Sequence, residues 1–405
     1  MSTIIRAARR SDLPAVYRVL ESAFTDAPIR LFIDQTEGDS TLRMRHLRVA
    51  EIDGRIAAHV RIFSRRMLIR GIPVRAGGIG SVASMPDARG LGLPSALLHD
   101  AIDVMARDNM PVSFLFTGIP AFYERLGWRI VHQPSLDVAV AREAASIPHD
   151  GAYRIRRITP SDLPALLSIY RQATAGSTGA VVRTPRTWRD AQRWLGEDRA
   201  GCLLAERAGR PVAFLRARSR AYGYQILEAE HARGHEAAIA ALLAKAAQRA
   251  VALDQSLTTS AVSGSRVSVP GGHALAVALR TLPSTRETAD VRYPTMMRIV
   301  SLDALIAVLL PQFDGRARTH SGAPFTLGLR APDGQSLTLD VRATGARIRR
   351  AAAAYQLDEA RTLDALLGQR RASDFVRPRP PATVRRRIDA LLPETPFHFW
   401  NSDRI

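Results

Sequence analysis

Cysteine, lysine and long apolar runs are almost absent from this 405-residue chain. Its one cysteine, Cys202, excludes an internal disulfide and is typical of a protein in a reducing cytoplasm. With one cysteine and no HExxH-type spacing, we expect no metal site. No run of about 18 apolar residues is present, which excludes a membrane-spanning helix. The chain begins with a charged stretch, so we expect no signal peptide and a cytoplasmic location.

The formal net charge of +19 would suit a nucleic-acid partner. Lys245 is the only lysine, however, and the arginines are spread over the whole chain. The nearest approach to a cluster is Arg385–Arg387, which lies in an expected helix. Uniform use of arginine in place of lysine indicates coding bias. We therefore predict no specific nucleic-acid partner, although polyanions should adhere non-specifically.

A short motif occurs twice and indicates an internal duplication. The residues Ser11-Asp12-Leu13-Pro14-Ala15 recur at 161–165, and Ile5-Arg6 recurs in the same register at 155–156. Both copies are typical of a short strand followed by a helix with a serine cap and proline in its first turn. The character of the chain changes near residue 291. We predict three units, at 1–145, 146–290 and 291–405.

Apolar patterning predicts a mixed α/β (α+β) fold in layers. Strands are expected at 47–51, 56–63, 79–84, 112–116, 128–132, 325–329 and 336–341, with a hairpin over 67–78. Helices are expected at 93–107, 237–253, 357–368 and 382–392. The final segment, 396–405, is rich in aromatic residues. Because chain ends are normally polar and frayed, we expect this one to be tied down.

The most informative segment runs from Val82 to Leu93, where an apolar strand passes through an arginine- and glycine-rich turn into a helix. Glycines at the mouth of a helix let backbone N–H groups turn toward an anion, most often a diphosphate. The spacing differs from GxxxxGK[ST] and from GxGxxG, which excludes those two phosphate loops. It resembles the Arg-x-x-Gly-x-Gly/Ala loop of the GCN5-related N-acetyltransferases (GNATs). Arg89 and Gly92 match, and Pro94 stands where glycine or alanine is usual.

This resemblance implies that the loop holds coenzyme A and that acetyl-CoA is the donor. The strand backbone would meet the acetyl carbonyl and the pantetheine arm, and one N–H would stabilise an oxyanion. Pro94 in a first helical turn lacks only an N–H that is orphaned in any case. The implied contacts are Val82, Ala83 and Ser84 on the strand, and Arg89, Gly90, Gly92, Leu93 and Ser95 around the pyrophosphate.

The second copy has lost part of this loop. Arg233-Gly234 precedes its helix, but Glu236 stands where the first loop has its second glycine. A carboxylate that faces a pyrophosphate is repelled by it. We predict that the second copy binds no coenzyme A and is mainly structural.

A second motif runs from Gly118 to Trp128, after the strand predicted at 112–116. In acetyltransferases of this fold, a tyrosine just after the fifth strand lies beside the cofactor sulfur, and Tyr123 matches that place. A phenol with a pKa of about 10 can protonate a leaving thiolate. The alternative is that Tyr123 is a core aromatic residue packed beside Phe122 and Trp128.

One active copy, one degenerate copy and a third unit with an anchored end together resemble the enhanced-intracellular-survival (Eis) family of aminoglycoside-type N-acetyltransferases. The resemblance implies a third unit like sterol carrier protein 2, a hexamer, and the terminal carboxylate of Ile405 as general base. It also places Phe24 and Asp26 in the substrate pocket, where Asp26 would pair with a cationic amine. Arg404 stands where the family has an acidic residue.

These features predict an acetyl-CoA-dependent N-acetyltransferase for a primary amine, either aminoglycoside-like or another small polyamine. We expect direct attack in a ternary complex, since Cys202 lies in the degenerate copy and no cysteine acyl-enzyme is foreseen. Two alternatives stay open. One is a protein or peptide lysine N-acyltransferase, and the other is a non-catalytic lipid-binding scaffold that uses the third unit.

Overall fold

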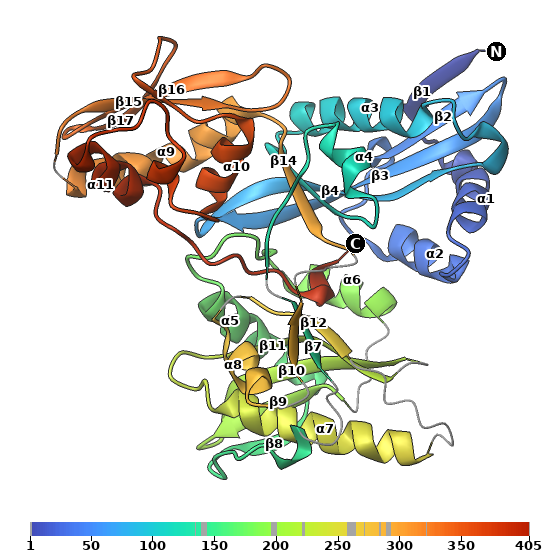
Figure 1. Cartoon of the computed structure of the whole chain (residues 1–405). Coiled ribbons are helices and arrows are strands. Elements are labelled where there is room, and N and C mark those ends of the chain that lie inside the picture. Colours follow the sequence, from blue (N-terminus) through green and yellow to red (C-terminus); the bar gives the residue numbers. More distant parts are fainter. Residues whose placement is uncertain are drawn as a thin grey trace.

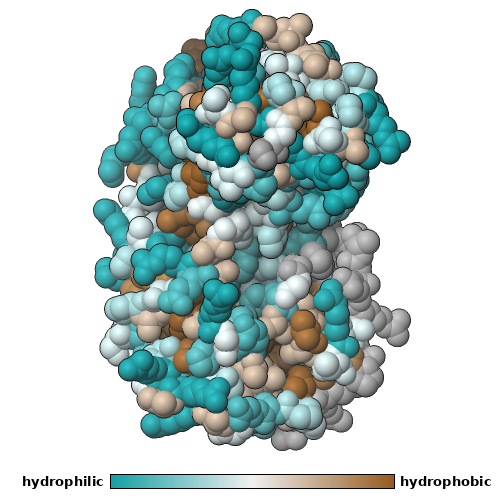
Figure 2. All heavy atoms as spheres, turned by 90° about the vertical axis from the view of Figure 1, so that its left-hand side faces the viewer, coloured by the Kyte–Doolittle hydropathy of each residue, from teal (hydrophilic) through white to brown (hydrophobic). Residues whose placement is uncertain are grey.

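The computed structural model describes residues 2–404 apart from 134, 139–143, 196–200, 221–222, 257–264, 271, 283–284, 289–292 and 321. It consists of three lobes, and the C-terminal segment runs to the centre, between the N-terminal and central lobes (Figure 1). In the part of the chain so described, no helix combines the length and apolar character needed to cross a membrane. The face drawn in Figure 2 carries its hydrophobic residues in scattered groups among hydrophilic ones.

The N-terminal lobe is a seven-stranded sheet with helices on both faces. Its helices are α1 (Leu13–Ala23), α2 (Ile29–Gly38), α3 (Leu93–Arg107) and α4 (Pro120–Glu124). In spatial order, its strands are β1 (Thr3–Ala7), β2 (Leu47–Ile52), β3 (Arg55–Ile69), β4 (Ile72–Ser84), β5 (Val112–Phe116), β14 (Thr295–Ile299) and β6 (Arg129–Ile130). β4 and β5 are parallel, and the other neighbours are antiparallel.

Helix α3 illustrates how this lobe packs. Its apolar stripe, which includes Leu97, Leu98 and Met105, is fully buried against one face of the sheet. The opposite face is covered by α1 through Val16 and Leu20. The helix predicted at 93–107 and the strand predicted at 112–116 are confirmed with the same bounds.

The central lobe has a four-stranded sheet in the order β11-β10-β9-β8 and a three-stranded sheet in the order β12-β7-β13. The strands are β7 (Ser135–Val138), β8 (Arg154–Arg157), β9 (Leu203–Arg207), β10 (Arg210–Arg220), β11 (Gly223–His231), β12 (Ser265–Ser268) and β13 (Arg286–Thr288). The helices are α5 (Leu163–Ala173), α6 (Pro185–Leu195), α7 (Ala238–Ser256) and α8 (Ala274–Arg280). The helix predicted at 237–253 is therefore confirmed as α7.

The duplicated motif forms the same ion-pair triad in both lobes. Arg6 of β1 pairs with Asp12 and with Glu51, at 2.7 Å in each case. In the second copy, Arg156 of β8 pairs with Asp162 at 2.7 Å and with Glu206 at 2.8 Å. Each arginine thereby ties the first strand of its copy to the following helix and to the neighbouring strand. The shared triad supports the predicted duplication.

Two strands pair across the predicted unit boundaries. β14, expected to open the third unit, is inserted between β5 and β6 of the N-terminal sheet. β7, expected to belong to the first unit, pairs with β12 and β13 in the central lobe. An open sheet edge can pair with any compatible strand, and local patterning does not say which. The boundaries at 145 and 290 stay predictions, and sheet pairing crosses both.

The C-terminal lobe has a four-stranded sheet in the order β17-β16-β15-β18. Its strands are β15 (Phe325–Arg330), β16 (Ser336–Arg342), β17 (Gly345–Arg349) and β18 (Tyr355–Gln356). Its helices are α9 (Leu302–Thr319), α10 (Glu359–Leu367) and α11 (Ala382–Leu391). The predictions at 325–329, 336–341, 357–368 and 382–392 are confirmed to within two residues at each end. Helix α9 was not predicted from the sequence.

Arg70, at the turn between β3 and β4, joins the N-terminal lobe to the C-terminal lobe. Its side chain is buried and donates hydrogen bonds to the carbonyls of Leu366 at 3.0 Å and Pro393 at 2.7 Å. Burial lowers the pKa of Arg70 to about 9. We expect Arg70→Met to lower the free energy of unfolding by about 2–4 kcal/mol, because the buried carbonyls lose their hydrogen-bond donor. Urea denaturation should show this loss, whereas Arg18→Met on the exposed face of α1 should change stability little.

Candidate active site

β4 and β5 separate part of the way along the N-terminal sheet. They pair from Ala76 opposite Val112 to Gly78 opposite Phe114, while β4 runs on to Ser84 and stays paired with β3. Beyond Gly78, the edge of β4 that faced β5 therefore presents its backbone groups to a ligand. The predicted contacts Val82, Ala83 and Ser84 lie on this free end.

A hydrogen-bond relay fixes the point at which the strands part. The Trp128 indole N–H donates to the Ser113 hydroxyl at 3.2 Å. That hydroxyl donates to the Gly77 carbonyl of β4 at 2.8 Å. Ser113 and Trp128 are fully buried, so the relay joins β4, β5 and the segment after α4 inside the core.

The loop after β4 turns through two glycines into α3. Gly90 has φ +80° and Gly92, the N-cap of α3, has φ +72°. A Cβ added to either glycine would meet no atom within 4 Å, so the loop borders open space. The N–H groups of Leu93 and Ser95 lie in the first helical turn, where no intrahelical partner exists. Loop and helix N-terminus together form a cradle that suits a diphosphate.

The corresponding loop of the central lobe is closed by its own side chain. The Glu236 carboxylate accepts a hydrogen bond from the backbone N–H of Gly234 at 3.2 Å. This contact occupies a backbone N–H of the second loop. In the first loop, N–H groups of this kind are left free to bind an anion. This contact supports the prediction that the second copy is structural.

Tyr123 lies on α4, just after β5, and is 7 % exposed. Its ring packs edge-on against Phe122, with centroids 5.0 Å apart, and against Trp128 at 6.1 Å. The packing beside Phe122 and Trp128 that the alternative interpretation foresees is therefore present. Burial raises the pKa of Tyr123 to about 12, so its hydroxyl keeps its proton at neutral pH. The role of proton donor stays a prediction that this protonation state supports.

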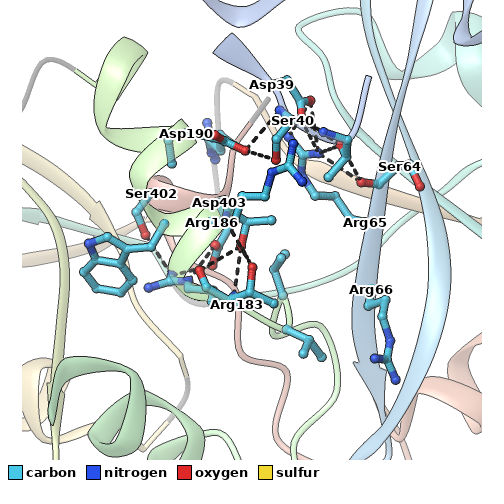
Figure 3. A pocket seen from close by; sticks show the side chains of 18 of the residues that line it. Asp39, Ser40, Ser64, Arg65, Arg66, Arg183, Arg186, Asp190, Ser402 and Asp403 are labelled. Carbon is cyan, nitrogen blue, oxygen red and sulfur yellow. Dashed lines mark hydrogen bonds and ion pairs between the residues drawn. The ribbon is translucent and has the colours of Figure 1, made fainter. Parts of the chain in front are cut away.

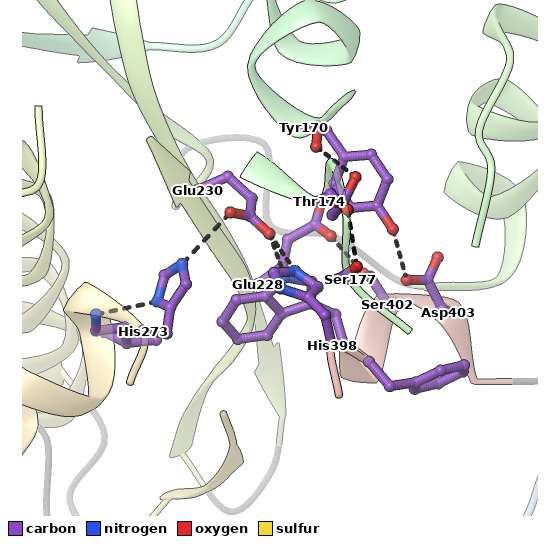
Figure 4. A network of polar contacts seen from close by, with 12 residues as sticks. Tyr170, Thr174, Ser177, Glu228, Glu230, His273, His398, Ser402 and Asp403 are labelled. Carbon is purple, nitrogen blue, oxygen red and sulfur yellow. Dashed lines mark hydrogen bonds and ion pairs between the residues drawn. The ribbon is translucent and has the colours of Figure 1, made fainter. Parts of the chain in front are cut away.

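The C-terminal segment is anchored on two buried glutamates of β11 (Figure 4). Glu230 accepts hydrogen bonds from His398 and from the Trp400 indole, each at 2.6 Å. Glu228 accepts one from the Ser402 hydroxyl at 2.6 Å. These contacts confirm that the aromatic chain end is tied down, and they give the degenerate copy a structural role.

Neighbouring side chains keep both glutamates ionised in the core. Burial by itself would raise the pKa of Glu228, but the charges of Arg183 and Arg216 outweigh it and hold that pKa well below its usual range. For Glu230, His398 and His273 likewise outweigh burial and lower the pKa. An uncompensated buried charge costs several kcal/mol, so these partners are required for the anchor to form.

The anchored segment ends beside β5. The Phe399 ring packs against Phe116 with centroids 5.1 Å apart, and the Arg404 guanidinium lies 4.8 Å from the centre of the same ring. Phe116 is the last residue of β5, on the open side of the split. Ile405 lies outside the described residues, so the role predicted for its carboxylate stays a prediction.

A cavity of about 410 Å³ lies where the N-terminal lobe, the central lobe and the C-terminal segment meet (Figure 3). Local sequence patterns do not predict this cavity, because its walls come from three separate segments, 39–75, 181–216 and 402–404. One sequence feature that could have indicated the cavity was the placement of Arg66 and Arg75 on facing strands of the predicted hairpin. Of the predicted substrate contacts, Phe24 packs on Phe32 with centroids 5.0 Å apart, and Asp26 lies in an exposed turn. Neither residue lines this cavity, and their predicted role is untested.

Comparison with known proteins identifies the N-terminal lobe. The family model described as "Acetyltransferase (GNAT) domain" matches residues 4–131, which span β1 to the end of β6. The chain carries a GNAT acetyltransferase domain. An uncharacterized N-acetyltransferase of Streptomyces avermitilis is 30 % identical over 165 residues, which are 38 % of this chain and 40 % of that protein. The match therefore spans less than half of either protein.

Solved structures resemble the chain over nearly its whole length. A conserved protein of Enterococcus faecalis superposes with a TM-score of 0.74 at 16 % identity, covering 98 % of both chains. Eis1 from Mycobacterium abscessus superposes with a TM-score of 0.66 at 17 % identity, covering 99 % of both. These likenesses confirm the predicted fold class: a GNAT fold followed by two further α/β lobes in the Eis-like arrangement.

Proposed function

We propose that the protein transfers an acetyl group from acetyl-CoA to a primary amine of a small molecule. One observation carries this proposal: the split between β4 and β5, the open glycine loop before α3 and a protonated Tyr123 all belong to one GNAT domain. The cradle fits coenzyme A, since Gly90 and Gly92 leave room for a diphosphate and α3 presents its positive end there. When bound, acetyl-CoA supplies a thioester-activated acetyl group and a thiolate leaving group.

The residues of the chain position the reactants and move protons. The backbone of Val82 and Ser84 orients the donor, and an N–H on this edge polarises the acetyl carbonyl. The amine nitrogen forms the new bond to the carbonyl carbon as the carbon–sulfur bond breaks. Tyr123 gives its hydroxyl proton to the departing sulfur and is reprotonated by the proton that the product nitrogen releases.

The transfer is direct, without an acyl-cysteine. Cys202, the one cysteine, is buried in the central lobe, where its sulfur contacts the Ala217 carbonyl at 3.8 Å. The amine therefore attacks within a ternary complex. For the acceptor, a primary amine on a small molecule fits a cavity of about 410 Å³ better than a folded protein does.

The test is release of free thiol from acetyl-CoA against a panel of amines, run with the purified full-length chain. The panel contains aminoglycosides, polyamines, amino acids and lysine peptides, with acetyl-CoA alone as control. We expect release that depends on a small-molecule amine. Release only with lysine peptides would favour a protein acyltransferase, and no release with any amine would contradict the proposal.

The pH dependence of kcat carries a further prediction. Only a neutral amine attacks, so kcat should rise with pH as the bound amine loses its proton. Because the pKa of Tyr123 is raised to about 12, the donor stays protonated and no fall in kcat is expected up to pH 10. Initial rates between pH 6 and pH 10 test this. A fall with a midpoint below pH 9 that disappears in Tyr123→Phe would contradict the stated protonation state.

A further inference from the structure

We propose that the cavity between the lobes binds an anionic group, a carboxylate or a phosphate, carried by the amine acceptor. This inference rests on the proposed function and deepens it by naming the acceptor class. It departs from the aminoglycoside-like or polyamine acceptor that the family resemblance implies. The evidence is the charge of the lining, an unsatisfied buried arginine nitrogen and the position of the cavity beside β5.

Arginines outnumber carboxylates in the cavity wall. Each lining carboxylate is already engaged: Asp39 pairs with Arg61 at 2.8 Å, Asp190 accepts from the backbone N–H of Ser40 at 3.0 Å, and Asp403 pairs with Arg183 at 2.8 Å. The lining arginines are Arg65, Arg66, Arg75, Arg183, Arg186, Arg216 and Arg404, and the lining acids are Asp39, Asp190 and Asp403.

Four of these arginines form no ion pair with any described residue: Arg66, Arg75, Arg186 and Arg404. Arg66 and Arg75 stand directly opposite each other on β3 and β4. Like charges in that arrangement repel, which destabilises the hairpin unless an anion lies between them. Figure 3 shows Arg66 on the strand wall, apart from the dashed contacts that join Arg65 to Asp39 and Arg183 to Asp403. The cavity wall thus holds free positive charge.

Arg183 also lines the cavity, and one nitrogen of its guanidinium has no hydrogen-bond partner among the described residues. Its side chain is only 6 % exposed, and its other nitrogens bond to Asp403 at 3.0 Å and to Glu228 at 2.6 Å. Nη1, however, is buried with no hydrogen-bond partner among the described residues. A buried donor left unbonded is costly, and a guanidinium donor favours a carboxylate or phosphate oxygen. Arg183 lines the cavity, so an anion bound there would lie beside this charge.

The cavity adjoins the place where transfer occurs. Arg404 lines it and also lies over the ring of Phe116 at the open end of β5. An acceptor whose anionic group is held by the cavity arginines therefore extends toward the split that receives the acetyl donor. A polycation would meet like charge along the same path.

Binding of inorganic phosphate tests the cavity without reference to catalysis. Trp188 and Trp194 line it, so their fluorescence reports occupancy. We expect saturable binding that weakens at least tenfold in Arg66→Gln/Arg75→Gln. The matched control is Arg18→Gln/Arg379→Gln, which removes the same charge from exposed sites and should bind as the unmodified chain does. Equal affinity in all three proteins would overturn the assignment.

A comparison of amines with and without an anionic group then distinguishes a carboxylate from a phosphate as the group that the cavity binds. We expect O-phosphoethanolamine or glycine to have at least a tenfold lower KM than ethanolamine. The amine with the lower KM shows whether the cavity prefers a phosphate or a carboxylate. The Arg66→Gln/Arg75→Gln variant should lose this preference. Thiol release with no preference for anionic amines would overturn the inference and leave the proposed function standing. Phosphate binding without thiol release from any amine would overturn the proposed function instead.

Discussion

Replacing Tyr123 with phenylalanine is expected to lower kcat by about 100-fold or more, the range of a lost general acid. The KM for acetyl-CoA should stay within about twofold, because the substitution removes only the hydroxyl. Phenylalanine keeps the edge-on contacts with Phe122 and Trp128, so the fold should be preserved. Steady-state rates at saturating amine, with a thermal melt of each protein, give both quantities.

Tyr153 provides the control for this substitution. It is also 7 % exposed, but it lies in the central lobe, where its hydroxyl makes long contacts of 3.5 Å to His235 and Arg207. Tyr153→Phe should leave kcat within about twofold. If Tyr123→Phe is equally harmless, Tyr123 is a core aromatic residue alone and the proposed proton donor is wrong.

Gly92→Glu is expected to raise the Kd for coenzyme A by about 100-fold. The substitution copies the second loop, where Glu236 stands at the aligned position. Two unit charges about 4 Å apart repel by about 4 kcal/mol at an effective dielectric constant of 20, and about 2.7 kcal/mol after screening is a factor of 100. The Cβ of the new side chain would meet no atom within 4 Å, so no steric clash is expected at that atom.

Backbone strain must be separated from this repulsion. Gly92 adopts φ +72°, where any side chain costs about 1–2 kcal/mol. Gly209, between β9 and β10, has the same φ of +72° and also borders open space. Calorimetric titration should show that Gly209→Glu binds coenzyme A normally. Unchanged affinity in Gly92→Glu would show that the loop before α3 does not hold the pyrophosphate.

Local sequence signals predicted the parts of the site that lie on one stretch of chain. The glycine loop, the start of α3 at Leu93 and the position of Tyr123 after β5 depend on neighbouring residues, and the structure brings them to one domain. The repeated Ser-Asp-Leu-Pro-Ala motif predicted the duplication. The structure supports it, because Arg6 and Arg156 make the same contacts in their respective copies.

The features that were not predicted from the sequence depend mostly on contacts between distant segments of the chain. β14 enters the N-terminal sheet from a position far along the chain, and spacing alone does not select its partner strand. Helix α9 was missed although its apolar residues are buried, since Pro311 interrupts the helical pattern. The cavity needs three separate segments, so Arg66 and Arg183 become neighbours of one space only in the folded chain.

The measurement that tests the central claim most directly is the initial velocity of thiol release with acetyl-CoA and an amine both varied. Direct transfer within one site predicts saturation by each substrate and double-reciprocal lines that intersect. Parallel lines would indicate an acyl-enzyme and contradict direct attack. Velocity that does not depend on the amine would contradict the assignment of the protein as an N-acetyltransferase.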